Sequence, residues 1–215
     1  MNQYMSLKDH VYNYISQKIT EGNLTPNEKI NEQLICEELQ ISRTPVREAL
    51  IQLTTEGYLE NLPRRGFRVR PIDENKAIEL YMIIGNLEGL ASSLALEFIT
   101  SKEIDYMKKL FTAMDQAISV GFYDNYYKLQ AEFHNTFINI CHNEELIRLL
   151  NQLKRSFIRQ SYINQDTDDL FEILKKTNEE HKQIIELFEK KDREGLIRYI
   201  KDVHWNTKNA KFDSI

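Results

Sequence analysis

Three histidines are the residues of this 215-residue sequence with the clearest capacity for metal chemistry: His134 in QAEFHNTF, His181 in NEEHKQII and His204 in KDVHWNT. Imidazole is a common ligand for zinc, nickel and iron. Histidines on three different helices can converge inside a helical bundle, as metal ligands do in such proteins. A lone histidine on a helix is more often a core or surface residue, so both interpretations stay open.

The second candidate for chemistry is the stretch ISRTPVREAL, residues 41–50, in which Arg43 and Arg47 are four residues apart. That spacing puts both side chains on one face of a helix, and arginine can bind guanine through two hydrogen bonds. Ser42 and Thr44 can cap the helix or bind phosphate oxygens, and a helix N-terminus favours anions. Because an isolated arginine pair is usually a solvated helix face, the surrounding elements decide between the two interpretations.

The elements around this stretch follow the order of a winged helix-turn-helix. We expect an amphipathic helix over residues 6–21, a short second helix capped by Asn31, and a third helix with Pro45 in its first turn. Alternating residues on either side of PRRG, residues 63–66, predict a β-hairpin. This order of elements over residues 6–70 defines the motif. The apolar residues expected to face its core are Leu7, Val11, Ile15, Ile19, Leu34, Ile35, Leu39, Val46, Ala49, Leu50 and Leu53.

The predicted hairpin has a basic tip. Arg64 and Arg65 are expected to contact the DNA backbone or the minor groove, and Gly66 allows the hairpin to approach DNA closely. Arg68 and Arg70 are expected to face the phosphates or the linker. A short second helix, a tight turn, a capped basic helix and a basic hairpin occur together, so DNA binding is favoured over a solvated arginine face.

After the linker RPID, residues 70–73, the sequence consists of long amphipathic segments, which predict an antiparallel bundle of about six helices. Thr100 with Glu103 is a candidate capping box, and Asn143 and Asp192 are candidate N-caps. The fold class is therefore mainly α, with a winged helix-turn-helix followed by a helical bundle. The expected helices of the bundle are residues 73–99, 101–120, 124–142, 144–164, 168–190 and 192–212.

Charge is distributed unevenly between the two expected domains, residues 1–70 and residues 71–215. The formal net charge of the whole chain is −5. Residues 43–70 hold six arginines against three glutamates, whereas residues 71–215 hold nineteen basic against twenty-four acidic residues. A short basic region on an acidic remainder is typical of a nucleic-acid-binding patch.

The composition predicts a helical, cytoplasmic protein. Seven glycines and four prolines are too few for an all-β fold with many tight turns. Cys36 and Cys141 lie far apart without metal-type spacing, so we expect no disulfide and a reducing compartment. We expect neither a signal peptide nor a membrane span, because the N-terminal residues lack the signal pattern and no apolar run reaches about 18 residues.

The segments SRTPVREAL and RRGFRV resemble the DNA-binding half of the GntR family of bacterial transcription regulators. The helical remainder resembles the effector domain of the FadR-like subgroup, often called the FCD domain. This resemblance implies a homodimer on a palindromic double-stranded DNA operator, with a small-molecule effector bound in the bundle. Arg43, Thr44, Arg47 and Gly66 match the family's DNA-contacting positions, and Gln33 stands where some relatives carry arginine.

The same resemblance implies a divalent transition metal, zinc or nickel, in the bundle. Many relatives carry an Asp-x3-His pattern on one helix and a single histidine on each of two later helices. His134, His181 and His204 match these histidines, but Gln130 occupies the aspartate position. Three histidines can hold Zn²⁺ with water or an anion as the fourth ligand. An amide is a poorer ligand than a carboxylate, so we expect weaker affinity than in a relative with the aspartate.

A second departure from the family pattern concerns the effector. Relatives often carry an arginine one helical turn before the glutamate that aligns with Glu88, and this arginine commonly faces the effector's carboxylate. Here that position is Ile84, which disfavours a simple organic acid. Arg155 and Arg159, four residues apart on a later helix, are candidate substitutes, or else form an outward charged face.

Three functions are compatible with these residues. We expect a transcription repressor whose operator affinity is modulated by a metabolite, a metal or both. The alternative is a metal-dependent enzyme centred on the three histidines, although the sequence has no Gly-rich phosphate loop, GxSxG, HExxH or CxxC motif. Glu180 points about 100° away from His181 on a helix, so spacing places no general base beside the histidines. The third possibility is an architectural DNA-bound dimer with structural histidines.

Overall fold

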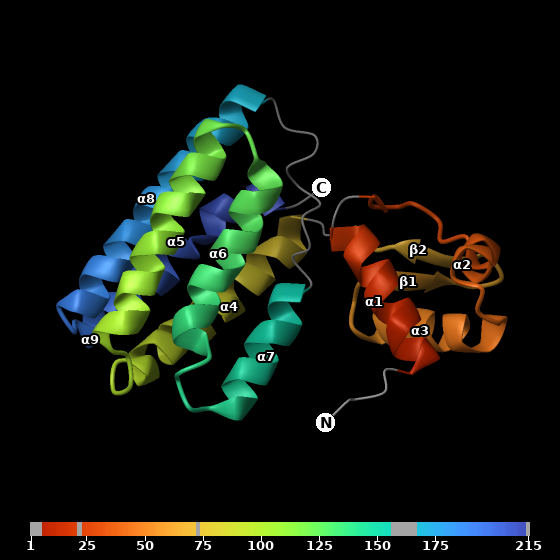
Figure 1. Cartoon of the computed structure of the whole chain (residues 1–215), viewed down its shortest axis with the longest axis horizontal. Helices are drawn as coiled ribbons and strands as arrows, with labels where there is room; N and C mark the ends of the chain where they lie inside the picture. The colour runs from red at the N-terminus through yellow and green to blue at the C-terminus, as the bar shows by residue number, and fades with distance from the viewer. Residues whose placement is uncertain (1–5, 21–22, 72–73, 156–166, 214–215) are drawn as a thin grey trace. The chain divides into compact units, whose positions relative to one another are not determined.

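The computed structural model describes residues 6–20, 23–71, 74–155 and 167–213 (Figure 1). Its chain divides into two compact units, an N-terminal one and a C-terminal one that begins at Glu74. The described residues are mostly helical, with one two-stranded sheet in the N-terminal unit. This architecture confirms the predicted fold class.

The N-terminal unit contains the three helices that the sequence predicts: α1 (Leu7–Thr20), α2 (Glu32–Leu39) and α3 (Arg43–Thr55). Asn31 caps α2, because its side-chain oxygen accepts a hydrogen bond from the backbone N–H of Leu34 at 3.1 Å. Gln40 takes a left-handed backbone conformation with φ of 54°, which ends α2 and allows a tight turn toward α3.

The core of this unit differs from the expected apolar stripes at two positions. Leu7 is exposed because it is the first residue of α1 and extends past the edge of the core. Leu34 is exposed because the short helix α2 turns Ile35 toward the core instead. The buried core residues are Val11, Ile15, Ile19, Ile30, Ile35, Ile41, Val46, Ala49, Leu50, Leu53, Tyr58, Leu59, Phe67 and Val69.

The wing is an antiparallel hairpin of β1 (Leu59–Leu62) and β2 (Gly66–Val69), which confirms the predicted hairpin. Arg64 and Gly66 have φ angles of 63° and 85°, as the tight connection between the strands requires. Glycine takes such angles without steric cost. The outer edge of β2 also pairs with the segment before α2, where the backbone N–H of Ile30 donates to the Phe67 carbonyl at 2.8 Å.

Six α-helices form the described part of the C-terminal unit, in agreement with the predicted bundle: α4 (Glu74–Ala95), α5 (Ser101–Ser119), α6 (Tyr123–Ile138), α7 (Glu144–Arg155), α8 (Thr167–Glu189) and α9 (Arg193–Tyr199). α5 packs against α6 and α8, and α4 packs against α6 and α9 (Figure 1). The predicted capping box of Thr100 and Glu103 is present at α5. Asn143 and Asp192 accept backbone N–H groups at the starts of α7 and α9, as predicted. The expected continuation of α7 to residue 164 lies outside the described residues.

The last predicted helix, residues 192–212, is wrong in its second half. After α9 the chain makes one π-helical turn, Ile200–His204, then leaves the helix at Trp205 and continues as a 3₁₀ segment, Thr207–Asp213. A π turn contains an extra residue compared with an α turn, and such turns are frequent at functional sites. Hydrophobic periodicity over a long window does not detect this single-residue insertion.

Two glycines allow α4 to approach α9 and the π turn closely. A Cβ atom on Gly85 would lie 2.8 Å from Cβ of Trp205, closer than side-chain carbons tolerate. A Cβ atom on Gly89 would lie 3.2 Å from the carbonyl oxygen of Ile197. The buried residue Glu88 lies on this same part of α4, so the close packing brings its carboxylate to Trp205.

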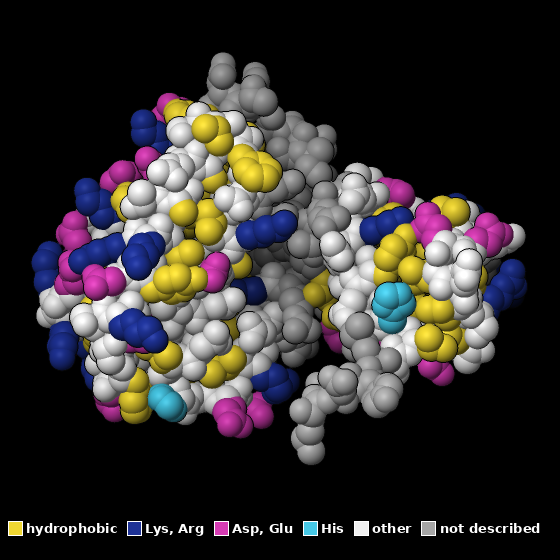
Figure 2. Space-filling model, viewed as in Figure 1, with side chains coloured by type: hydrophobic (Ala, Val, Ile, Leu, Met, Phe, Trp, Pro, Cys, Tyr) yellow, Lys and Arg dark blue, Asp and Glu magenta, His cyan; other side chains and the backbone are white. Residues whose placement is uncertain are grey.

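The surface of the bundle carries both signs of charge. On the face seen in Figure 2, basic and acidic side chains are interspersed over the C-terminal unit, the pattern of an ordinary solvated surface. In the described ranges, no helix is long and apolar enough to cross a membrane.

Candidate functional site

The N-terminal turn of α3 presents its polar residues to solvent. Ser42 occupies the N-cap position with an extended backbone, but its side chain makes no capping hydrogen bond. Ser42, Arg43, Thr44 and Arg47 are all exposed, while Val46 on the opposite side is fully buried. The hydroxyl and guanidinium groups of this turn are therefore oriented away from the core and accessible to a ligand.

The other predicted DNA contacts are also at the surface. Arg64 and Arg65 are exposed at the tip of the wing, and Gly66 is half-buried at the start of β2. Gln33 is exposed on α2 and donates a hydrogen bond to Glu37 at 3.0 Å within that helix. Arg68 was expected to face phosphates or the linker, but its guanidinium pairs with Glu60 across the hairpin.

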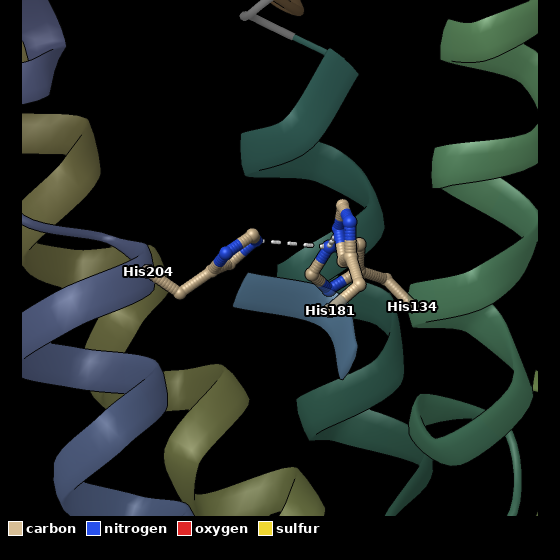
Figure 3. Close-up of side chains that lie close together, drawn as sticks. All are labelled: His134, His181 and His204. Atoms are coloured by element: carbon tan, nitrogen blue, oxygen red, sulfur yellow. Dashed lines mark hydrogen bonds between the residues drawn. The ribbon is translucent and has the colours of Figure 1, made fainter. Parts of the chain in front are cut away.

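The three predicted metal ligands meet in the interior of the bundle. His134 comes from α6, His181 from α8 and His204 from the π turn, and Figure 3 shows their imidazoles pointing toward one another. The Nε2 atom of His134 lies 3.3 Å from that of His181 and 3.2 Å from that of His204. All three residues are buried, and the possible ligand atoms lie within 4.8 Å of one another.

Two buried carboxylates bind the outer nitrogens of this cluster. Glu88 Oε2 on α4 lies 2.9 Å from Nδ1 of His134, and Glu180 Oε2 on α8 lies 3.0 Å from Nδ1 of His204. A carboxylate only accepts hydrogen bonds, so both imidazoles carry a proton on Nδ1 and donate it. Glu180 thus faces His204 and not its neighbour His181, as the helical geometry predicts.

This tautomer has a direct consequence for the cluster. A neutral imidazole that is protonated on Nδ1 presents a bare lone pair on Nε2. When both imidazoles are neutral and protonated on Nδ1, the Nε2 lone pairs of His134 and His204 face each other across 3.2 Å, and a cation between them would relieve the repulsion. Imidazoles whose outer nitrogens donate to carboxylates are the usual form of histidine ligands in metal sites. The donor set present here consequently fits a divalent transition metal.

Aromatic side chains enclose the cluster. The indole N–H of Trp205 donates to Glu88 Oε2 at 2.8 Å, so one carboxylate oxygen accepts from both an imidazole and an indole. The ring of Phe133 lies edge-on to His181 with ring centres 4.7 Å apart. Burial and the nearby carboxylates of Glu180 and Glu186 raise the pKa of Tyr199 to about 12.

Sequence reasoning did not predict the roles of Glu88 and Glu180, because neither is near its histidine partner in the sequence. A weak signal existed for Glu180, which directly precedes His181 on α8. Gln130 lies one turn before His134 on α6 and is half-buried.

Ile84, Arg155 and Arg159 are the residues that the sequence singles out in relation to an effector. Ile84 is fully buried, as its apolar character requires, and no lysine or arginine is buried within the described parts of the chain. Arg155 is the last residue of α7, but its side chain is outside the described set, as is the whole of Arg159. The prediction that these two arginines bind an effector therefore stays a prediction.

The helix α3 exposes a basic turn beside a basic wing, and the same chain carries a helical bundle with a buried histidine cluster. This combination is typical of DNA-binding regulators with a separate effector domain. Residues 7–69 match the family model described as "Bacterial regulatory proteins, gntR family", and residues 79–203 match the "FCD domain" model. The chain belongs to the GntR family of bacterial transcription regulators and carries an FCD domain. This membership identifies a transcription regulator and gives no support to the metal-dependent enzyme.

Individual relatives agree with this assignment. The chain is 36% identical over 130 residues to the Nta operon transcriptional regulator of Aminobacter aminovorans, a match that spans 60% of each chain. It is 28% identical over 190 residues to the HTH-type regulator YdhC of Bacillus subtilis, covering 88% of this chain and 84% of that one. The structure of Escherichia coli McbR/YncC has the same fold, with a TM-score of 0.77, 23% identity and 93% of each chain covered.

Proposed function

We propose that the chain represses transcription in the cytoplasm as a homodimer, whose two recognition helices and two wings bind the half-sites of a palindromic operator. The observation that carries the proposal is the exposed turn of Ser42, Arg43, Thr44 and Arg47 at the N-terminus of α3, next to the basic wing. In winged helix-turn-helix proteins this turn enters the major groove. Arg43 and Arg47 then bind guanine edges, while Ser42, Thr44 and Gln33 contact phosphates or bases nearby.

The wing has a different role in this proposal. Arg64 and Arg65 contact the backbone or the minor groove, and the glycine at position 66 keeps the start of β2 free of a side chain. Contacts to phosphates position a protein on DNA but carry no direct sequence information. The wing therefore contributes mainly affinity, and α3 contributes sequence preference.

The bundle is the sensing part of the proposal. We propose that His134, His181 and His204 hold a divalent transition metal, zinc or nickel, with Glu88 and Glu180 fixing two of the imidazoles. The mutually facing Nε2 atoms and the carboxylate-bound Nδ1 atoms support it. A bound metal supplies positive charge and an open coordination position for a small effector. Gln130 at the family's aspartate position supports an affinity lower than that of an aspartate-bearing relative.

The effector itself is proposed to be a small molecule other than a simple carboxylic acid. Ile84 provides no charge for a carboxylate, and the buried polar side chains of the described bundle include no basic residue besides histidine. Arg155 and Arg159 remain the candidate contacts if the effector is anionic. Effector binding would shift the population between operator-compatible and incompatible arrangements of the dimer.

The experiment that tests DNA reading uses duplex DNA selected by the full-length chain from a random-sequence pool. Arg43→Ala and Arg47→Ala are each expected to cost about 1–3 kcal/mol in binding to that DNA and to relax one base position. Lys109→Ala, an exposed substitution on α5, is the matched control and should bind as the wild type does. Unchanged binding by the Arg43→Ala/Arg47→Ala double variant would show that α3 is not the reading helix.

A further inference from the structure

Glu32 is an acidic side chain placed on the basic DNA-reading surface. It is the first residue of α2, directly after the N-cap Asn31, and its side chain is 24% exposed. A carboxylate near DNA phosphates lowers affinity through repulsion between like charges. A carboxylate is favourable in the first turn of α2, and the contacts of Glu32 indicate a second role.

The Glu32 carboxylate lies between α3 and the wing. Oε2 is 3.3 Å from Nε of Arg47, and Oε1 is 3.9 Å from the position that a Cβ on Gly66 would occupy. The carboxylate therefore lies beside the start of β2 as well as beside α3. The Arg47 side chain is 63% exposed, so the ion pair with Glu32 restricts a long side chain that is largely in solvent.

The atom that Glu32 engages on Arg47 matters for base recognition. An arginine has five N–H donors, and a bidentate contact to guanine O6 and N7 needs two of them in a fixed direction. The Glu32 carboxylate pairs with Arg47 at Nε, which leaves the two terminal nitrogens of Arg47 for a base. An exposed ion pair adds little to the free energy of unfolding, so this contact mainly affects the orientation of the Arg47 side chain.

We propose that Glu32 is a positioning residue that orients Arg47 for guanine recognition, and that it thereby increases sequence preference at the expense of total DNA affinity. This inference rests on the proposed role of α3 in reading DNA. It has a distinctive signature: removing Glu32 weakens binding to the preferred sequence relative to other DNA, while binding to unrelated DNA becomes tighter.

The test is a double-mutant cycle with the full-length chain, using duplex DNA selected by the wild type and a scrambled duplex of equal composition. Glu32→Ala should lower the ratio of the two affinities about fivefold or more and should tighten binding to the scrambled duplex. In the Arg47→Ala background, Glu32→Ala should leave the ratio unchanged, because the residue that it positions is absent. Glu38→Ala, an exposed glutamate on the same helix that pairs with Lys18 and not with a proposed DNA contact, is the matched control for loss of negative charge.

Each other outcome has a definite meaning. An unchanged ratio for Glu32→Ala, or the same loss of ratio with and without Arg47, would overturn the positioning role. The latter result would point instead to direct base contact by Glu32. If Arg47→Ala alone leaves the ratio unchanged, the proposed function of α3 fails, and with it this inference. Glu32→Gln keeps a hydrogen-bond acceptor and should retain part of the preference, which separates positioning from a loss of folding.

Discussion

Glu88 Oε2 accepts hydrogen bonds from the imidazole of His134 and the indole of Trp205, so one buried carboxylate joins α4, α6 and the residue that follows the π turn. Glu180 does the same for His204 from α8. These two residues fix which nitrogen of each imidazole faces the interior. The capacity of the cluster to bind a metal therefore depends on residues that do not themselves belong to the histidine set.

The first prediction concerns these carboxylates. Glu88→Gln keeps the size of the side chain but removes its charge and its obligatory acceptor role, and should weaken zinc affinity by about 10- to 100-fold. His134→Ala should abolish binding at this site. Competition with a chromophoric chelator measures both. Glu97→Gln, at a surface ion pair with Arg193, and His10→Ala, an exposed histidine of the N-terminal unit, are the controls.

Wild-type zinc affinity in Glu88→Gln would contradict the carboxylate's role, and full metal content in His134→Ala would contradict the site itself. The comparison does not depend on DNA binding. It therefore tests the bundle separately from the proposed reading helix.

Individual residues differed in how far the sequence could predict them. The three histidines stand on segments that the periodicity predicts as helical, so their convergence in a bundle was one of the two interpretations that the sequence left open. Their carboxylate partners were not, because the contacts join residues 46 and 24 positions apart and depend on helix packing. The Arg47–Glu32 pair likewise depends on how α2 crosses α3.

At the scale of helices and strands, local signals predicted most of the fold. Asn31, Asn143 and Asp192 cap their helices as their side-chain chemistry predicts, and the alternation around the basic tip gives the wing. The π turn before Trp205 had no such signal. It lies where the segment around Trp205 packs closely against the glycines of α4, a contact between residues far apart in the sequence.

The second prediction tests that packing. Gly85→Ala places a Cβ 2.8 Å from Cβ of Trp205, so α4 and the π turn must move apart. The substitution should destabilise the chain by about 1–3 kcal/mol, as overpacking in a core does. Chemical denaturation followed by circular dichroism measures it. Asn86→Ala, on the exposed side of the same helix, should have little effect, and equal stabilities of the two variants would contradict the close packing.

The third prediction concerns the capping box of α5. Hydrogen bonds from the hydroxyl and backbone N–H of Thr100 lower the pKa of Glu103 below its ordinary value of 4.5. A carboxyl whose pKa is lower in the folded chain stabilises the fold above the unfolded pKa, and this contribution disappears as the pH falls through the folded pKa.

Glu103→Gln retains an acceptor for Thr100 but has no charge. The wild type should therefore melt at a higher temperature than Glu103→Gln above about pH 5, and the difference should shrink as the carboxyl becomes protonated in acid. Melting curves over a pH series measure this. A difference in melting temperature that does not change with pH would mean that the charge of Glu103 does not stabilise the fold.

At the scale of the whole molecule, the uneven charge of the sequence has a simple explanation. The acidic excess belongs to residues 71–215, and the basic residues of 43–70 lie on α3 and the wing. A net charge of −5 is therefore compatible with DNA binding, because the electrostatic potential near α3 and the wing depends mainly on the basic residues located there. What the sequence could not predict is the ligand, since Gln130 and Ile84 replace the residues that guide such a prediction in relatives.

The central claim is that one molecule couples the histidine cluster to DNA reading. The most direct measurement is the affinity for the selected duplex, by fluorescence anisotropy, of chain stripped of metal and of chain loaded with zinc. We predict that the two affinities differ by about fivefold or more in the wild type, a typical allosteric coupling. They should be equal in His134→Ala, which binds no zinc at the cluster. Equal affinities in a wild type shown to have taken up zinc would contradict the coupling.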